Sequence, residues 1–324
     1  MNLRDYMYPV RKSVVMRCAL FLFFLSISFL HAQKMANKKH LEPFRWNHPL
    51  PEQFEKDRVR HGTFESKANK TTVGYNILLP VVYGVDKERR FPVVYLLHGG
   101  RPGSEAKHLR MAPFVNDAIE KKLIPPAIYV FVNGGPVSHY DYPTPLKHLG
   151  ENFETKGNTT FVKELIPHID KTYRTIDERK GRVVEGYSQG GRGALRTAFC
   201  YPELFSAASA GSAGLATEWR IQQNGGKESN YLQFTPGDDA YTLAATYAGR
   251  MKKFPMKVLL YSGNSKKDFN WEGNVAYSKF LDSLRVKHEH LLIPECGHST
   301  QQAYTISGAR LFQFLAPILR QATY

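Results

Sequence analysis

The segment Arg182-Val-Val-Glu-Gly-Tyr-Ser-Gln-Gly-Gly-Arg-Gly-Ala194 decides the fold of this chain. Its first six residues form a short, mainly apolar run that is typical of a buried strand, and the residues from Gln189 to about Phe199 have helical composition. A strand followed at once by a helix leaves Ser188 on the turn between them. Small neighbours are needed there because larger side chains would collide with the two elements. The Gly-x-Ser-x-Gly pattern in this setting indicates a serine held on a strained turn at the end of a strand.

Short apolar runs alternate with longer amphipathic segments along the rest of the chain. Further strands are predicted at 72–79, 91–98, 127–132, 207–210, 257–262 and 290–293, and helices at 108–123 and 160–173. Such alternation predicts an α/β fold, with a mostly parallel central sheet and helices on both faces. Ligands bind at the carboxyl ends of the strands in sheets of this kind. Reactive side chains that follow strand ends are therefore the candidate functional residues.

The N-terminal 32 residues differ in composition from the rest of the chain. Basic residues precede an apolar run at 18–30, and the small residue Ala32 follows two positions after its end. Because a membrane-spanning helix needs about 20 apolar residues, this run is too short for a permanent span. Residues 1–32 are therefore predicted to be a signal peptide, cleaved near Ala32–Gln33, with no stable membrane insertion afterwards. A secreted or periplasmic protein is expected, and an uncleaved interfacial anchor is the alternative.

Composition limits the remaining possibilities for the 324 residues. Residues 33–65 are rich in proline and charge and are predicted to form an N-terminal arm, and 66–324 a single domain. The formal net charge is +15, but the basic residues are scattered, so no nucleic-acid partner is expected. Cys200 and Cys296 are too few for a disulfide framework, although an oxidising compartment would permit one bridge. Two free thiols are the favoured interpretation.

A serine becomes an effective nucleophile only beside a base. His298 follows the last predicted strand, and Asp268 follows the strand at 257–262, with Glu272 as the alternative acid. This gives the chain order serine, acid, histidine that accompanies the Gly-x-Ser-x-Gly turn. The acid would hold the imidazole in the right tautomer and stabilise its charged form.

Backbone amides near Ser188 are the candidates for stabilising negative charge on a substrate oxygen. Gln189 opens the helix after the turn, so its N–H points toward the reaction centre. Gly100, in the loop after the strand at 91–98, is the second candidate, with Arg101 next.

Other polar residues are assigned structural roles. Asp238 and Asp239 precede a predicted helix and are interpreted as caps. His288 and His290 would share one face of a strand, but no third ligand is evident, so no metal site is predicted.

Four sequence segments resemble one known family. They are Tyr95-Leu-Leu-His-Gly-Gly100, Gly186-Tyr-Ser-Gln-Gly-Gly-Arg-Gly-Ala194, Tyr201-Pro-Glu-Leu-Phe-Ser206 and Gly297-His298. They are similar to the esterase D-like group of the α/β-hydrolase superfamily, which includes the feruloyl and acetyl-xylan esterases of carbohydrate esterase family 1 and the mycolyltransferases. The resemblance runs from about residue 70 to 320. It implies the α/β-hydrolase fold, a catalytic triad of Ser188, Asp268 and His298, oxyanion amides at Gly100 and Gln189, and neither metal nor cofactor.

The function expected from these features is that of a secreted serine carboxylic-ester hydrolase. It would remove feruloyl or acetyl groups from plant polysaccharide, acylated sugars or small esters. An acyltransferase or small-molecule thioesterase would use the same triad, and a non-catalytic carbohydrate-binding protein is the least favoured alternative.

Three residues are predicted to contact the substrate. Trp271 has a side chain suited to stacking on a sugar or an aryl acid, or to packing in the core or rim. Tyr187 directly precedes the nucleophile, and Asn133 begins the segment where the family shapes its substrate pocket.

Overall fold

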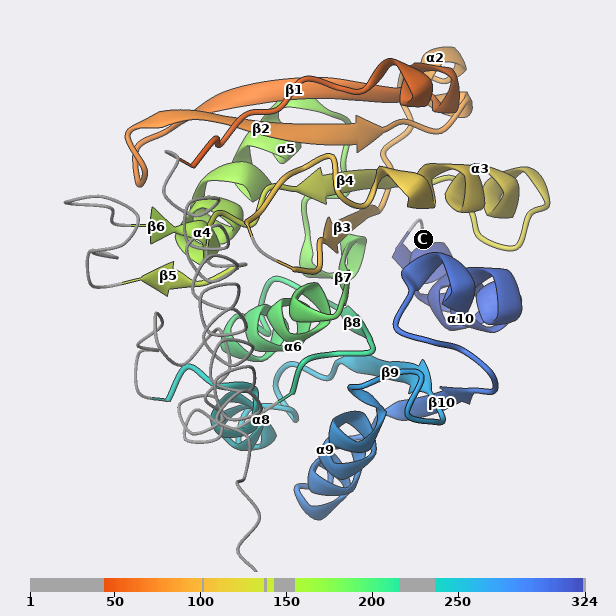
Figure 1. Ribbon diagram of the computed structural model, residues 1–324. Coiled ribbons are helices and arrows are strands. Elements are labelled where there is room, and N and C mark those ends of the chain that lie inside the picture. Colours follow the sequence, from red (N-terminus) through yellow and green to blue (C-terminus); the bar gives the residue numbers. More distant parts are fainter. Residues whose placement is uncertain (1–43, 101, 137–138, 143–154, 216–236, 323–324) are drawn as a thin grey trace, which may run out of the picture.

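The computed structural model describes residues 44–100, 102–136, 139–142, 155–215 and 237–322 (Figure 1). The predicted signal peptide, its cleavage point, the first part of the arm (33–43) and Arg101 lie outside the described residues.

An eight-stranded sheet forms the centre of the molecule, in the order β1-β2-β4-β3-β7-β8-β9-β10. Its strands are β1 (Val59–Ser66), β2 (Thr71–Leu78), β3 (Val93–Leu97), β4 (Ile128–Val132), β7 (Arg182–Tyr187), β8 (Ala207–Gly211), β9 (Lys257–Gly263) and β10 (Glu289–Ile293). The six strands from β4 to β10 in this order run parallel, and β2 is antiparallel to both of its neighbours, β1 and β4. A separate two-stranded sheet pairs β5 (Asp141–Tyr142) with β6 (Thr155–Lys156).

Helices cover both faces of the central sheet, as Figure 1 shows. One face carries α3 (Ala112–Glu120) and α10 (Thr300–Ala322); the other carries α6 (Gln189–Cys200), α8 (Ala240–Ala248), α9 (Trp271–Ser283) and the continuous helical segment of η3 (Thr160–Leu165) and α5 (Ile166–Thr172). The remaining short helices are η1 (Glu52–Asp57), α2 (Val82–Val85), η2 (Leu109–Met111), α4 (Gly157–Thr159) and η4 (Arg179–Gly181).

Burial on both faces explains why the central strands lack alternation. In β3, Tyr95 and Leu97 pack into the core on one side of the sheet, and Val94 and Leu96 pack into the core on the other. A strand covered on both faces needs apolar residues at every position. The predicted fold class, an α/β sheet with helices on both faces, is confirmed.

The predicted arm requires a correction, because part of it belongs to the sheet. Val59–Ser66 forms β1 and pairs along its whole length with β2. Further back, Trp46 is buried, and its carbonyl accepts a hydrogen bond from the Gly74 N–H at 2.7 Å. The arm prediction was wrong for these residues because β1 is an edge strand, where exposed charged side chains are favoured and obscure the apolar positions.

Several smaller predictions also have outcomes. Asp239 caps α8, and its carboxylate accepts from the Tyr241 and Thr242 N–H groups, as predicted. Asp238 is not a cap and instead forms an ion pair with Arg196. Cys296 is buried and Cys200 half-buried, and both carry free thiols.

Within the described part of the chain, no helix combines the length and apolar character needed to cross a membrane.

Candidate active site

Ser188 occupies the turn between β7 and α6 with φ 58° and ψ −121°. A positive φ is unfavourable for a residue other than glycine, so this turn has to be held by its surroundings. Its N–H donates to the Gly211 carbonyl at 2.8 Å, and its carbonyl accepts from the N–H groups of Arg192 and Gly214, both at 3.1 Å. These bonds tie the turn to β8 and α6, so the strained conformation is fixed by the fold.

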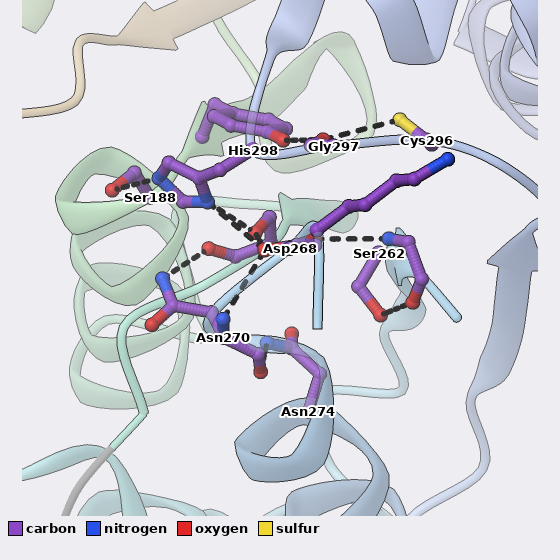
Figure 2. Close-up of polar contacts among 12 residues, drawn as sticks. Ser188, Ser262, Asp268, Asn270, Asn274, Cys296, Gly297 and His298 are labelled. Atoms are coloured by element: carbon purple, nitrogen blue, oxygen red, sulfur yellow. Dashed lines mark hydrogen bonds and ion pairs between the residues drawn. The ribbon is translucent and has the colours of Figure 1, made fainter. Parts of the chain in front are cut away.

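The structure brings Ser188, His298 and Asp268 together (Figure 2). Ser188 Oγ lies 2.9 Å from His298 Nε2, and His298 Nδ1 lies 3.0 Å from Asp268 Oδ1. Ser188 follows β7, Asp268 follows β9 and His298 follows β10, so three parallel strands deliver the side chains to one edge of the sheet. Glu272, the alternative acid, is the second residue of α9 and makes no hydrogen bond to His298.

Asp268 is completely buried, yet its surroundings favour the charged form. Burial by itself raises the pKa of this carboxyl, but hydrogen bonds from His298, Ser212 and two backbone N–H groups outweigh burial and hold the pKa below its usual range. The backbone donors are Gly263 at 2.9 Å and Asn270 at 3.2 Å. An ionised Asp268 can therefore accept the Nδ1 proton of His298.

Ser212, which sequence reasoning missed, contacts both the acid and the imidazole. Its Oγ donates to Asp268 Oδ1 at 2.5 Å and lies 2.7 Å from His298 Nδ1. Its own carbonyl accepts from Asn270 Nδ2 at 2.8 Å. The signal was present in its position, because Ser212 directly follows β8, the strand that lies between β7 and β9.

Phe269 is a second residue that sequence reasoning missed. Its ring is 72% exposed and lies against the His298 imidazole, with 3.9 Å between ring centroids. A large exposed apolar ring beside the imidazole offers a contact surface to a bound molecule. Phe269 directly follows Asp268, the predicted acid, and no other feature of the sequence indicates that it lies at the site.

The loop after β3 lies directly against the turn of Ser188. A Cβ on Gly99 would approach Ser188 Cβ to 3.0 Å, so the backbone reaches this position only without a side chain. Gly100 has φ 68°, a conformation that glycine adopts at no steric cost. Gly100, Gln189 and Ser188 all line the same cavity.

This cavity has a volume of about 1390 Å³ and opens over Ser188 and His298. Its walls come from η1, the segment between β3 and α3, the start of α6, the start of α9 and the start of α10. Of the residues predicted to contact substrate, Tyr187 lines it, and its ring also packs on His298 with 5.2 Å between centroids.

Asn133 and Trp271 do not line the cavity. Both donor hydrogens of Asn133 serve the Trp46 carbonyl and Glu105, and its oxygen accepts from the Gly135 N–H, so this buried amide holds the N-terminal segment to the sheet. Trp271 begins α9, of which Glu272, Gly273 and Ala276 face the cavity. At 100° per residue, Trp271 points away from that side.

Among the residues that the structure describes, no group of three or more His, Cys, Asp or Glu side chains could hold a metal ion. Both ring nitrogens of His288 have partners, Ser278 Oγ at 2.7 Å and the Val286 carbonyl at 2.9 Å.

A serine on a strand-to-helix turn, with aspartate and histidine from later strand ends of a mostly parallel sheet, defines the α/β-hydrolase class. Within that class, the family described as Putative esterase matches residues 66–313. The chain therefore belongs to this esterase family.

Two curated proteins illustrate the relationship. An esterase of Mycobacterium tuberculosis is 27% identical over 268 residues, covering 79% of this chain and 56% of the relative. An endo-1,4-β-xylanase/feruloyl esterase of Xylanibacter ruminicola is 28% identical over 162 residues, covering 47% of this chain and 22% of the relative. The chain thus spans little more than half the length of the first relative and less of the second.

Solved structures have the same fold. A ferulic acid esterase superimposes with a TM-score of 0.64 at 20% identity, covering 81% of this chain and 98% of the other. A ferulic acid esterase of Anaeromyces mucronatus gives 0.59 at 18% identity, covering 82% and 91%. These similarities confirm the α/β-hydrolase fold.

Proposed function

We propose that this chain is a serine carboxylic-ester hydrolase in which Ser188 is the nucleophile, His298 the general base and Asp268 the triad acid. The observation that carries the proposal is the pair of contacts from His298, 2.9 Å to Ser188 Oγ and 3.0 Å to Asp268 Oδ1. Nucleophile, base and orienting acid in hydrogen-bond reach are the arrangement that activates a serine.

The reaction follows from these positions. Ser188 Oγ attacks the ester carbonyl carbon while its proton passes to His298 Nε2, and the carbonyl oxygen becomes an oxyanion. The N–H groups of Gly100 and Gln189 would donate to that oxyanion. His298 then gives the proton to the departing alcohol, which leaves an acyl-Ser188. A water molecule attacks the acyl-enzyme with His298 again as base, and this releases the acid.

Asp268 orients the His298 imidazole and stabilises its charged form in both acylation and deacylation. It accepts the Nδ1–H and so presents Nε2 to Ser188 as a proton acceptor. When His298 becomes positively charged, the ionised carboxylate beside it offsets that charge.

The proposed substrates are feruloyl or acetyl esters of plant polysaccharide or of acylated sugars. The feruloyl esterases among the similar proteins support this class, and so does a cavity of about 1390 Å³, which has room for a sugar ester. The exposed ring of Phe269 offers a stacking surface at the site. The basic, apolar and small-residue pattern of residues 1–32 supports export of the protein.

Replacement of Ser188 by alanine tests the chemistry. Hydrolysis of an aryl acetate should fall by about 10⁶-fold in kcat, while the circular dichroism spectrum stays that of the parent. A fluorophosphonate probe should label the parent and not the variant. Ser283→Ala, an exposed serine at the end of α9, is the matched control and should retain both activity and labelling. Undiminished hydrolysis by Ser188→Ala would overturn the proposal.

A substrate panel tests the proposed class. Methyl ferulate, acetylated xylan and simple aryl acetates are compared by kcat/KM, with a sugar acceptor present in a parallel series. The first two should be hydrolysed with free acid as the product. Transfer of the acyl group to the added sugar would identify an acyltransferase instead.

A further inference from the structure

One wall of the cavity carries positive charge close to the nucleophile. This wall is built by η1 and by the segment between β3 and α3. It presents the cationic side chains of Lys107 and Arg110 among apolar groups such as Phe54 and Met111. We call these two side chains together with their apolar neighbours the cationic wall.

Lys107 reaches toward the reaction centre. Its Nζ would lie 3.7 Å from a Cβ on Gly100, and the adjoining Gly99 packs against Ser188. Its ammonium group has no hydrogen-bond or ion-pair partner among the residues that the structure describes. Lys107 is exposed to solvent in the cavity lining, and partial desolvation by the surrounding protein lowers the pKa of its ammonium group.

Arg110 extends the same wall toward the start of α10. Its Nη1 donates to Gln301 Oε1 at 3.3 Å, which is a neutral acceptor. The charge of the guanidinium is therefore not compensated by this contact.

The acidic residues of η1, which are Glu52, Glu55 and Asp57, do not line the cavity. Glu105, two residues before Lys107, is buried, and its oxygens accept from the N–H and ring of His48 and from Asn133. Glu272 is the one acidic side chain among the described residues that line the cavity, and it belongs to α9, which forms a different wall.

We propose that the cationic wall is a subsite for a carboxylate carried by the ester substrate. The inference rests on the proposed hydrolase function and narrows it, because it makes an acidic substrate the preferred one. Hydrogen bonds from a charged donor to a carboxylate are about twice as strong as those between neutral groups. A neutral substrate would displace water from Lys107 and leave the ammonium without a partner.

Pairs of matched esters test this subsite. For a carboxylate on the acyl group, the 4-nitrophenyl monoester of adipic acid is compared with that of adipamic acid, in which a carboxamide replaces the acid. For a carboxylate on the alcohol, acetylated methyl glucuronoside is compared with acetylated methyl glucoside. In at least one pair the acid should be preferred by about tenfold in kcat/KM, the effect expected of one good charged hydrogen bond.

Substitutions in the cationic wall test whether its two cations cause the preference for the acidic ester. Lys107→Met and Arg110→Met should each reduce the ratio of kcat/KM for the acidic ester to kcat/KM for its neutral partner severalfold. Lys252→Met removes one positive charge from the exposed segment before β9, at the opposite edge of the sheet, and should leave the preference intact. Equal rates for acid and neutral ester in both pairs would overturn the proposal. So would a preference that survives in both cationic-wall variants.

Binding separates this proposal from the hydrolase assignment. In the Ser188→Ala background, calorimetry on both pairs should show tighter binding of the acid than of its neutral partner in at least one pair, and Lys107→Met should reduce that difference. If the parent enzyme hydrolyses neither ester but this binding difference is present, the hydrolase assignment fails and the subsite stands. If the parent hydrolyses both at equal rates and no binding difference exists, the subsite fails alone.

Discussion

At the scale of single residues, Ser212 shares the Nδ1 side of His298 with Asp268. Its hydroxyl donates to Asp268 at 2.5 Å and lies 2.7 Å from Nδ1, so it limits the rotation of both side chains. We expect Ser212→Ala to lower kcat by about 10- to 100-fold, which corresponds to one hydrogen bond to a charged group. KM should change little, because Ser212 does not line the cavity.

Steady-state kinetics on an aryl acetate measures this split between kcat and KM. Ser209→Ala, a buried serine within β8, is the control and should leave both constants near those of the parent. A raised KM with unchanged kcat in Ser212→Ala would show that the hydroxyl does not position the imidazole.

The proposed catalytic residues could be placed from the sequence because each lies just beyond the end of a predicted strand. Ser188, Asp268 and His298 each follow a strand that is visible as an apolar run, and parallel strands bring such positions to one edge. The direction in which a side chain points cannot be predicted from the sequence pattern in the same way. Trp271 was expected in the cavity, whereas Phe269, two residues earlier, lies on the imidazole.

At the scale of elements, the central strands were predictable and the edge strand was not. β7 spans Arg182–Tyr187 as predicted, since its mainly apolar residues directly precede the Gly-x-Ser-x-Gly turn, although the buried strand also contains Arg182 and Glu185. β1 has a buried residue at only some positions, with exposed charge between them, and it gains its pairing partner only when β2 is in place. The helix predicted at 160–173 is irregular: the π-helical turns of η3 directly precede α5, and Pro167 lies in the first turn of α5.

Two adjacent aspartates at the start of α8 have different roles, because Asp239 caps the helix and Asp238 forms an ion pair. Asp239 accepts from two backbone N–H groups, so Asp239→Ala should lower the free energy of unfolding by about 1 kcal/mol. Asp238 pairs with Arg196, a side chain that is only 2% exposed. Asp238→Asn should therefore cost more, about 3 kcal/mol, because it leaves a buried guanidinium without its counter-charge.

Urea denaturation of both variants measures the two effects, and kcat should remain that of the parent in each. Equal destabilisation by the two substitutions would contradict the distinction between cap and ion pair.

At the scale of the whole molecule, the central sheet contains a buried carboxyl group that lies outside the active-site cavity. Glu185 of β7 is 2% exposed, faces α10, and accepts a hydrogen bond from the Tyr304 hydroxyl. Burial raises the pKa of Glu185 to about 7, although the bond from Tyr304 acts against the rise. Glu185 is not among the residues that line the cavity, so its effect is on stability.

The sign of that effect is set by proton uptake. Between the ordinary pKa of about 4.5 in the unfolded chain and about 7 in the folded protein, the folded state binds the extra proton. Stability therefore falls as pH rises through this window and is lower by a constant amount above it, at most about 3 kcal/mol. Burial lowers the pKa of His98 and of His139, and these groups contribute the opposite slope, since they must be deprotonated in the folded state.

Glu185→Gln isolates the carboxyl, because the histidines are the same in variant and parent. The glutamine keeps an oxygen for Tyr304 but cannot ionise, so the variant should match the parent near pH 5 and exceed its stability near pH 8 by up to about 3 kcal/mol. Urea denaturation at both pH values measures the difference, with the exposed Glu289→Gln as a control that should show none. A variant whose stability relative to the parent is the same at pH 5 and pH 8 would show that Glu185 does not change protonation between these values.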